Sequence, residues 1–162
     1  MRLLSIGVNR NENIIGSIPR NRLESYVSSS GVNRFTGLVR NNFIRQVFKY
    51  IGFTGHSDPA AHLDMIQRAY PWDTVQMPLN IGDVHRELSF EKDVLPLAVE
   101  NNIGVIGMKS NGMGRLGKSG IATPTEGLRY SLSLPVSTVV SGIDSMSILE
   151  ENLLVAKIFK SL

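Results

Sequence analysis

The feature that most constrains this fold is a fourfold alternation of strand-forming runs with stretches whose apolar residues have helical spacing. The sequence predicts strands at 50–54, 74–78, 103–108 and 138–141, and helices at 60–70, 90–101, 125–134 and 145–159. The strands start about 24 to 35 residues apart, a spacing typical of β–α–β crossovers. We therefore expect an α/β fold with a parallel sheet. Because about eight β–α units close a TIM (β/α)8 barrel, these units predict a partial barrel, about half of one.

The first of these units is the clearest. Phe53 lies in an apolar run, and Gly55 allows a turn directly after it. Ser57 and Asp58 are candidate helix N-caps, and Pro59 suits the first position of the helix. Polar residues at the carboxyl end of a parallel strand are where α/β proteins keep their ligand-binding groups.

A half-barrel has two open edges. The strands near 50 and 138 would each lack one neighbour, and open apolar edges invite pairing with another chain. We therefore expect this chain to dimerise, to aggregate or to need a second chain that completes the barrel.

Bulk properties are those of one globular domain. The chain has 162 residues and a mean hydropathy of +0.00. It has no apolar run long enough to span a membrane, so no membrane partner is expected. It also has no cysteine, which excludes disulfides and thiolate metal sites and fits a reducing compartment. We expect a cytoplasmic protein.

Residues 1–47 do not follow the alternating pattern. Residues 1–49 carry eight Lys/Arg against two Asp/Glu, whereas residues 50–162 carry nine against twelve. We expect 1–47 to be an irregular basic segment, poorly ordered or atypical, with short strand-like islets at 14–15 and 37–39. An Arg- and Ser-rich organelle transit peptide is one alternative. A nucleic-acid-binding arm is another, which the thin aromatic content disfavours.

Four segments, in this order and spacing, resemble the C-terminal half of the aldo/keto reductases. They are 49–59, 75–80, 103–109 and 139–145, and the resemblance spans about residues 48–159. It implies the fifth to eighth units of the barrel, as an NADP(H)-dependent oxidoreductase domain. The reaction implied is hydride transfer to or from a carbonyl or alcohol, with the cofactor across the carboxyl ends of the strands.

The resemblance assigns the nicotinamide end of the cofactor to three strand ends. Thr54 and Gly55 stand where the family has a Ser-Asn pair that holds the carboxamide, so the amide of that pair is absent here. Gln76 matches a glutamine that shares this duty. The alternative for Gln76 is a hydrogen-bonded core amide, and we favour the ligand role. Met108 stands where the family has an aromatic ring stacked on the nicotinamide.

The resemblance assigns the pyrophosphate to the loop after residue 108. Lys109, Ser110, Asn111 and Gly112 match the family's loop there, and a lysine offers a direct charge to phosphate. The alternative for Lys109 is a solvated loop lysine.

The adenosine end is assigned to the last β–α unit. Gly142 and Ser145 lead to a helix N-terminus, which favours anions, although Asp144 is a like charge for a 2′-phosphate. Glu151 and Asn152 match an acid-amide pair that meets the adenine in the family. Their alternative is two exposed helix residues.

The family's catalytic Asp, Tyr, Lys and His lie in the first half of the barrel, and nothing in residues 1–47 matches them. We therefore assign no catalytic residue. The alternative function is a catalytically silent fragment or an interaction module. The spacings of His56, His62 and His85 place no pair on one helix face, so we assign no metal site.

A competing motif lies in residues 112–119, which satisfy the P-loop pattern G-x-x-x-x-G-K-S. A P-loop must open directly into a helix, whereas Gly120 and the Thr-Pro-Thr of 123–125 favour a loop over 109–123. A P-loop nucleotide-binding protein is therefore the second alternative.

Overall fold

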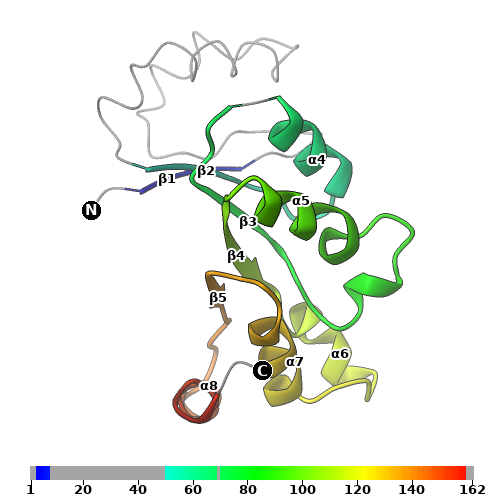
Figure 1. The fold of residues 1–162 in the computed structure, drawn as a ribbon. Coiled ribbons are helices and arrows are strands. Elements are labelled where there is room, and N and C mark those ends of the chain that lie inside the picture. Colours follow the sequence, from blue (N-terminus) through cyan, green and yellow to red (C-terminus); the bar gives the residue numbers. More distant parts are fainter. Residues whose placement is uncertain (1–2, 8–49, 69, 160–162) are drawn as a thin grey trace, which may run out of the picture.

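The computed structural model describes residues 3–7, 50–68 and 70–159, and it contains one parallel sheet of five strands. The strands are β1 (Leu3–Gly7), β2 (Tyr50–Thr54), β3 (Thr74–Pro78), β4 (Gly104–Met108) and β5 (Thr138–Val140). Their order in the sheet equals their order in the chain (Figure 1). The alternating α/β fold is confirmed. From β2 to β5 each crossover moves one strand further in the same direction, so the sheet is singly wound.

The helices connect these strands. The longer ones are α4 (Pro59–Gln67), α5 (Leu95–Glu100), α7 (Pro124–Ser133) and α8 (Met146–Ile158). Short elements are the 3₁₀ turns η1 (Asp83–His85) and η3 (Gly112–Gly114), the π-helix η2 (Phe90–Val94) and the one-turn helix α6 (Arg115–Lys118). Within the described residues no helix is both long and apolar enough to cross a membrane.

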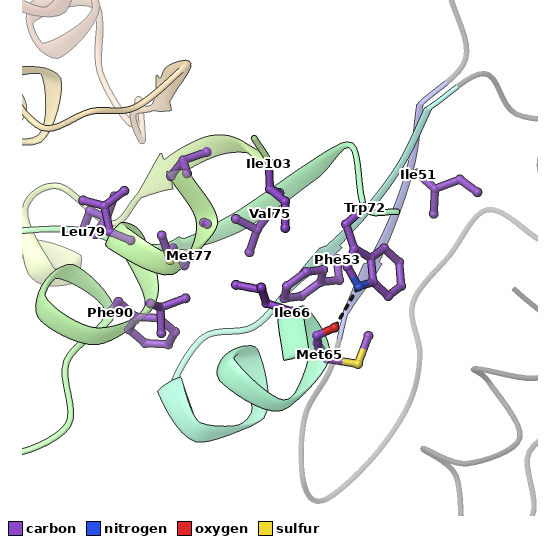
Figure 2. Close-up of a cluster of buried hydrophobic side chains, with 14 residues drawn as sticks. Ile51, Phe53, Met65, Ile66, Trp72, Val75, Met77, Leu79, Phe90 and Ile103 are labelled. Carbon is purple, nitrogen blue, oxygen red and sulfur yellow. Dashed lines mark hydrogen bonds between the residues drawn. The ribbon is translucent and has the colours of Figure 1, made fainter. Parts of the chain in front are cut away.

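The two faces of the sheet differ in burial. Ile51, Phe53 and Val75 have at most 1% of their surface exposed, and Phe53 and Val75 lie toward the helices (Figure 2). Gln76 and Ile106 alternate with the buried positions and are only partly buried. Successive strand residues point to opposite faces, so this alternation means that one face of the sheet is buried. The helices that follow β2, β3 and β4 cover that face (Figure 1). The singly wound order is consistent with this one-sided layering, because right-handed crossovers then all fall on the same side.

Aromatic rings fill the core between the sheet and α4. Phe53 lies with its ring centroid 5.1 Å from that of Trp72, in an edge-to-face arrangement. Trp72 donates its indole N–H to the Met65 carbonyl at 3.0 Å (Figure 2). Such pairs fix the ring orientations as well as burying apolar area. They hold α4 against β2, so the turn between the two has a defined place.

Side-chain caps start three of the helices. Asp58 caps α4 by accepting from the Ala61 N–H at 3.2 Å, with Pro59 at the first position, as predicted. Ser145 caps α8 by accepting from the Ile148 N–H at 3.3 Å, also as predicted. Thr123 and Glu126 form a capping box on α7. Each cap satisfies amide groups that the first turn of a helix leaves unpaired.

The N-terminal expectation was wrong in one segment. Residues 3–7 form β1, which pairs in parallel with β2 from Leu3 opposite Tyr50 to Gly7 opposite Thr54. The strand at residue 50 therefore has a neighbour on both sides. The strand-like islets at 14–15 and 37–39 lie outside the described residues, as does the rest of the 8–47 segment. The open-edge prediction stands for β5, which is the last strand of the described sheet.

Two predicted helices and one predicted loop also need correction. The helix predicted at 60–70 ends at Gln67. The helix predicted at 90–101 opens with the π-turn of η2, where the Glu91 N–H donates to Asp83 Oδ2 and to Ser89 Oγ. Val99 of α5 is 44% exposed. The loop predicted at 109–123 contains η3 and α6.

Candidate functional site

Three predicted site residues meet at the carboxyl edge of the sheet. Thr54 ends β2 and lies opposite Gln76 of β3 in the register. The Gly55 N–H donates to the Gln76 carbonyl at 3.3 Å, which carries the pairing one residue beyond the strand. The Gln76 side chain reaches the next strand, where its Nε2 donates to the Met108 sulfur at 3.5 Å. The sheet thus places a hydroxyl, an amide and a thioether side by side.

Two of these polar groups are poorly satisfied within the protein. The Thr54 hydroxyl oxygen is buried and has no hydrogen-bond partner among the described residues. The printed bond of the Gln76 amide goes to a thioether, which is a weak acceptor. Buried polar groups are normally paired, and an orphan in a strand-end site is a common mark of an absent ligand or water. These groups could exchange hydrogen bonds with an amide.

His62 is buried beside this row and contacts the backbone of β3. Its ring is 1% exposed and lies between Phe53 and Phe90, at centroid distances of 5.3 and 4.9 Å. Its Nε2 lies 3.4 Å from the Gln76 carbonyl oxygen, and its Nδ1 lies 3.1 Å from the Asp58 carbonyl oxygen. Burial is the main cause that lowers the pKa of His62, which favours the neutral ring. His62 therefore connects α4 to the backbone of β3 under the site.

Positive charge gathers beside this row. Lys109 follows β4 directly with a left-handed backbone (φ 57°), and its carbonyl accepts from the Gly112 N–H at 2.8 Å in a tight turn. Burial and then the charge of Arg115 lower the pKa of Lys109. Burial and then the charge of Lys109 lower the pKa of His56. Lys109 and Arg115 thus bring positive charge to this loop, whereas the lowered pKa of His56 favours its neutral ring. Positive charge at a strand end suits an anionic ligand.

From the sequence, His56 was weighed only as a metal ligand, and its coupling to Lys109 was missed. The two residues are far apart in the chain, and the signal lies in topology: His56 follows β2 and Lys109 follows β4, and both strands end at the same edge.

Ser110 and Asn111 pack under α7. Ser110 is 2% exposed, and a Cβ added at Gly127 would lie 2.5 Å from the Asn111 Oδ1 and 2.8 Å from the Ser110 carbonyl oxygen. Glycine at 127 therefore allows this close approach. The Asn111 Oδ1 is buried without a hydrogen-bond partner among the described residues. Gly112 follows with a φ of 55°, a conformation that glycine adopts without strain.

The last β–α unit carries the remaining predicted residues. Asn152 donates its Nδ2 to the Ser141 hydroxyl at 3.2 Å, which ties α8 to the end of β5. Gly142 and Ser145 lie between β5 and α8 and are exposed. Glu151 is exposed and accepts from the Ser147 hydroxyl at 3.4 Å. Register places Val140 opposite Met108, so the chain leaves β5 beside the point where Lys109 leaves β4.

The P-loop pattern adopts a different geometry from a nucleotide-binding loop. Lys118 is the last residue of the four-residue helix α6, not the first residue of a long helix. The Ser119 hydroxyl donates to the Leu116 carbonyl at 3.0 Å, and Gly120 then ends the turn with a φ of 70°. A P-loop instead needs its Lys and Ser at a helix N-terminus that faces the phosphates.

Neither the scan against protein-family models nor the search of curated proteins returned a match to this chain. Functional inference therefore depends on the chemistry of the strand ends.

Proposed function

We propose that the carboxyl edge of the sheet binds a nicotinamide dinucleotide, NADP(H), as the cofactor-binding half of an aldo/keto-reductase-like barrel. The observation that carries the proposal is the row of Thr54, Gln76 and Met108, with its buried unpaired hydroxyl and weakly paired amide. Ligands of open parallel sheets and barrels bind beyond the carboxyl ends of the strands, which is where this row lies.

The residues present fit three chemically distinct parts of such a cofactor: the nicotinamide, the pyrophosphate and the adenosine phosphate. Gln76 and Thr54 could exchange hydrogen bonds with the nicotinamide carboxamide, which has both a donor and an acceptor. Lys109 could neutralise the pyrophosphate, and the neutral ring of His56 lies close enough to be influenced by the charge of Lys109. Gly142 and Ser145 lie exposed before α8, where an adenosine phosphate could meet the helix N-terminus. Ser110 and Asn111 would position the loop from below, because they pack against α7.

The singly wound sheet supports the part of the proposal that concerns a half-barrel. In a TIM barrel successive strands are neighbours and all helices lie outside, as they do from β2 to β4 here. Bound NADPH supplies a hydride. The described residues provide binding and orientation for it. Among them we assign no proton donor for the carbonyl, and a second chain could supply one. Without such a chain, the same site makes the protein a cofactor-binding or interaction module.

Calorimetric titration with NADPH, NADH and ATP tests the proposal. We expect saturable binding of NADPH, weakened about three- to tenfold by Gln76→Leu, which removes a hydrogen bond of the neutral amide. Lys109→Gln should weaken binding and reduce its salt dependence, because it removes a charge beside the phosphates. Lys118→Gln is the matched control, since Lys118 is exposed on α6 and should leave the affinity unchanged.

Absence of NADPH binding would contradict the proposal and leave the silent-fragment alternative. Binding of ATP that is lost in Lys118→Gln would instead support the P-loop alternative.

A further inference from the structure

Exposed apolar side chains concentrate in the last β–α unit. Among the described residues, ten large hydrophobic side chains are exposed, and six of them lie between residues 140 and 158. They are Val140, Ile143, Met146, Leu153, Leu154 and Ile158. Single exposed apolar residues are normal, but a concentration in one element marks an interaction surface.

Helix α8 uses only one of its faces within the described fold. Val155 is 2% exposed, and α8 contacts α7. Away from Val155, four exposed residues follow the spacing i, i+3, i+4, i+7: Glu150, Leu153, Leu154 and Lys157. This spacing places them in one stripe along the helix. We call these four residues the α8 stripe.

The α8 stripe is symmetric about its own centre. Its two leucines, 50% and 58% exposed, lie at the middle, with an acid on the N-terminal side and a base at the same distance on the C-terminal side. A two-fold axis between Leu153 and Leu154 would bring the leucines of two copies together. The same axis would place Glu150 of each copy opposite Lys157 of the other. Two-fold contacts of this kind are self-complementary by construction.

We propose that α8 docks antiparallel against α8 of a second copy of this chain through the α8 stripe. The antiparallel direction follows from charge, because parallel helices in register would set Glu150 against Glu150. It also opposes the two helix dipoles favourably. This interface is independent of cofactor binding.

Charge also favours a second copy over a membrane surface. Asp144, Glu150 and Glu151 all flank the exposed apolar residues of this unit. Amphipathic helices that bind anionic bilayers instead carry Lys and Arg on the flanks of the apolar face.

Sedimentation equilibrium of the full chain tests the interface. We expect a concentration-dependent dimer that Leu153→Glu converts to a monomer. Glu150→Lys and Lys157→Glu should each weaken the dimer about tenfold, because each turns two symmetric attractions into repulsions. The double variant Glu150→Lys/Lys157→Glu should recover the wild-type dissociation constant. Circular dichroism checks that each variant is folded.

A wild-type monomer at all concentrations would overturn the proposal. So would a dimer that Leu153→Glu leaves intact, because the contact would then lie elsewhere. A double charge variant that is weaker than either single variant would rule out the antiparallel pairing. Binding to phosphatidylserine vesicles that depends on Leu153, with no dimer in solution, would assign the stripe to a membrane instead.

Discussion

The β–α unit that starts at β2 and the unit that starts at β5 have similar sequence patterns but very different burial. Ile51 and Phe53 of β2 are at most 1% exposed, whereas Val140 of β5 is 51% exposed. The difference lies in their neighbours: β2 pairs with strands on both sides, and β5 is the last strand of the described sheet. The comparison teaches that the fold has a packed region around β2–β4 and a thinly covered region at β5 and α8.

The largest expected effect on stability comes from a substitution that leaves a cavity in the packed region around β2–β4. Phe53→Ala removes a ring that contacts both Trp72 and His62, and we expect the free energy of unfolding to fall by about 3 to 5 kcal/mol. Urea denaturation measures it. Val140→Ala is the matched control in the other region, and a loss there as large as at Phe53 would contradict the comparison.

A second prediction concerns pH. Burial lowers the pKa of His62 in the folded protein, so the unfolded chain binds this proton more readily. Stability should therefore be fully present above the ordinary histidine pKa of about 6.5 and should fall as the pH drops below it. His62→Gln should flatten this dependence in urea denaturation between about pH 7 and 5.

The exposed His85 provides the control, because His85→Gln should keep the slope of the wild-type protein. An unchanged slope in His62→Gln would show that another group causes the pH dependence.

A third, smaller effect tests the contact of α7, the helix that precedes β5, with η2. Tyr130 of α7 donates its hydroxyl to both carboxylate oxygens of Glu91, at 2.7 and 2.9 Å. Tyr130→Phe should reduce stability by about 0.5 to 1 kcal/mol, since the pair is partly solvated. Burial, then the hydrogen bond and charge of Glu91, raise the pKa of Tyr130 to about 12. Glu91→Gln should lower that pKa toward its ordinary value, which ultraviolet absorbance of the phenolate would show.

The smallest effect is expected on the exposed face of α8. Leu154 is 58% exposed, so Leu154→Ser should change the unfolding free energy of the dilute protein by less than about 0.5 kcal/mol. Denaturation at several protein concentrations would separate this term from any dimer contribution. A loss of 2 kcal/mol or more in dilute solution would show that the side chain is buried within one chain.

The central strands could be predicted from sequence because each is an apolar run between breakers. The predicted ranges 50–54 and 74–78 are those of β2 and β3. β1 was missed because its five residues precede a long stretch without the alternating pattern. In α8 the apolar residues surround the helix, and Leu153, Ala156 and Ile158 are exposed. A pattern shows which residues could be buried, whereas burial itself depends on which elements lie beside them.

For the candidate site, too, the grouping of residues at the strand ends preceded the structure, whereas the contacts between its loops did not. The family resemblance grouped Thr54, Gln76 and Met108, and strand topology brings these three residues to one edge of the sheet. The packing of Asn111 under Gly127 and the coupling of His56 to Lys109 depend on tertiary contacts between loops, which have no local signal.

The pairing of β1 with β2 has a consequence for the order of events during synthesis. Leu3 lies opposite Tyr50, so β1 leaves the ribosome well before its partner strand exists. Closing such a long loop costs entropy before any strand contact compensates for it, and contacts this distant in sequence slow folding. The nascent chain must therefore hold β1 unpaired until residues 50–54 emerge, whereas β2, β3 and β4 can assemble nearly as fast as they are made.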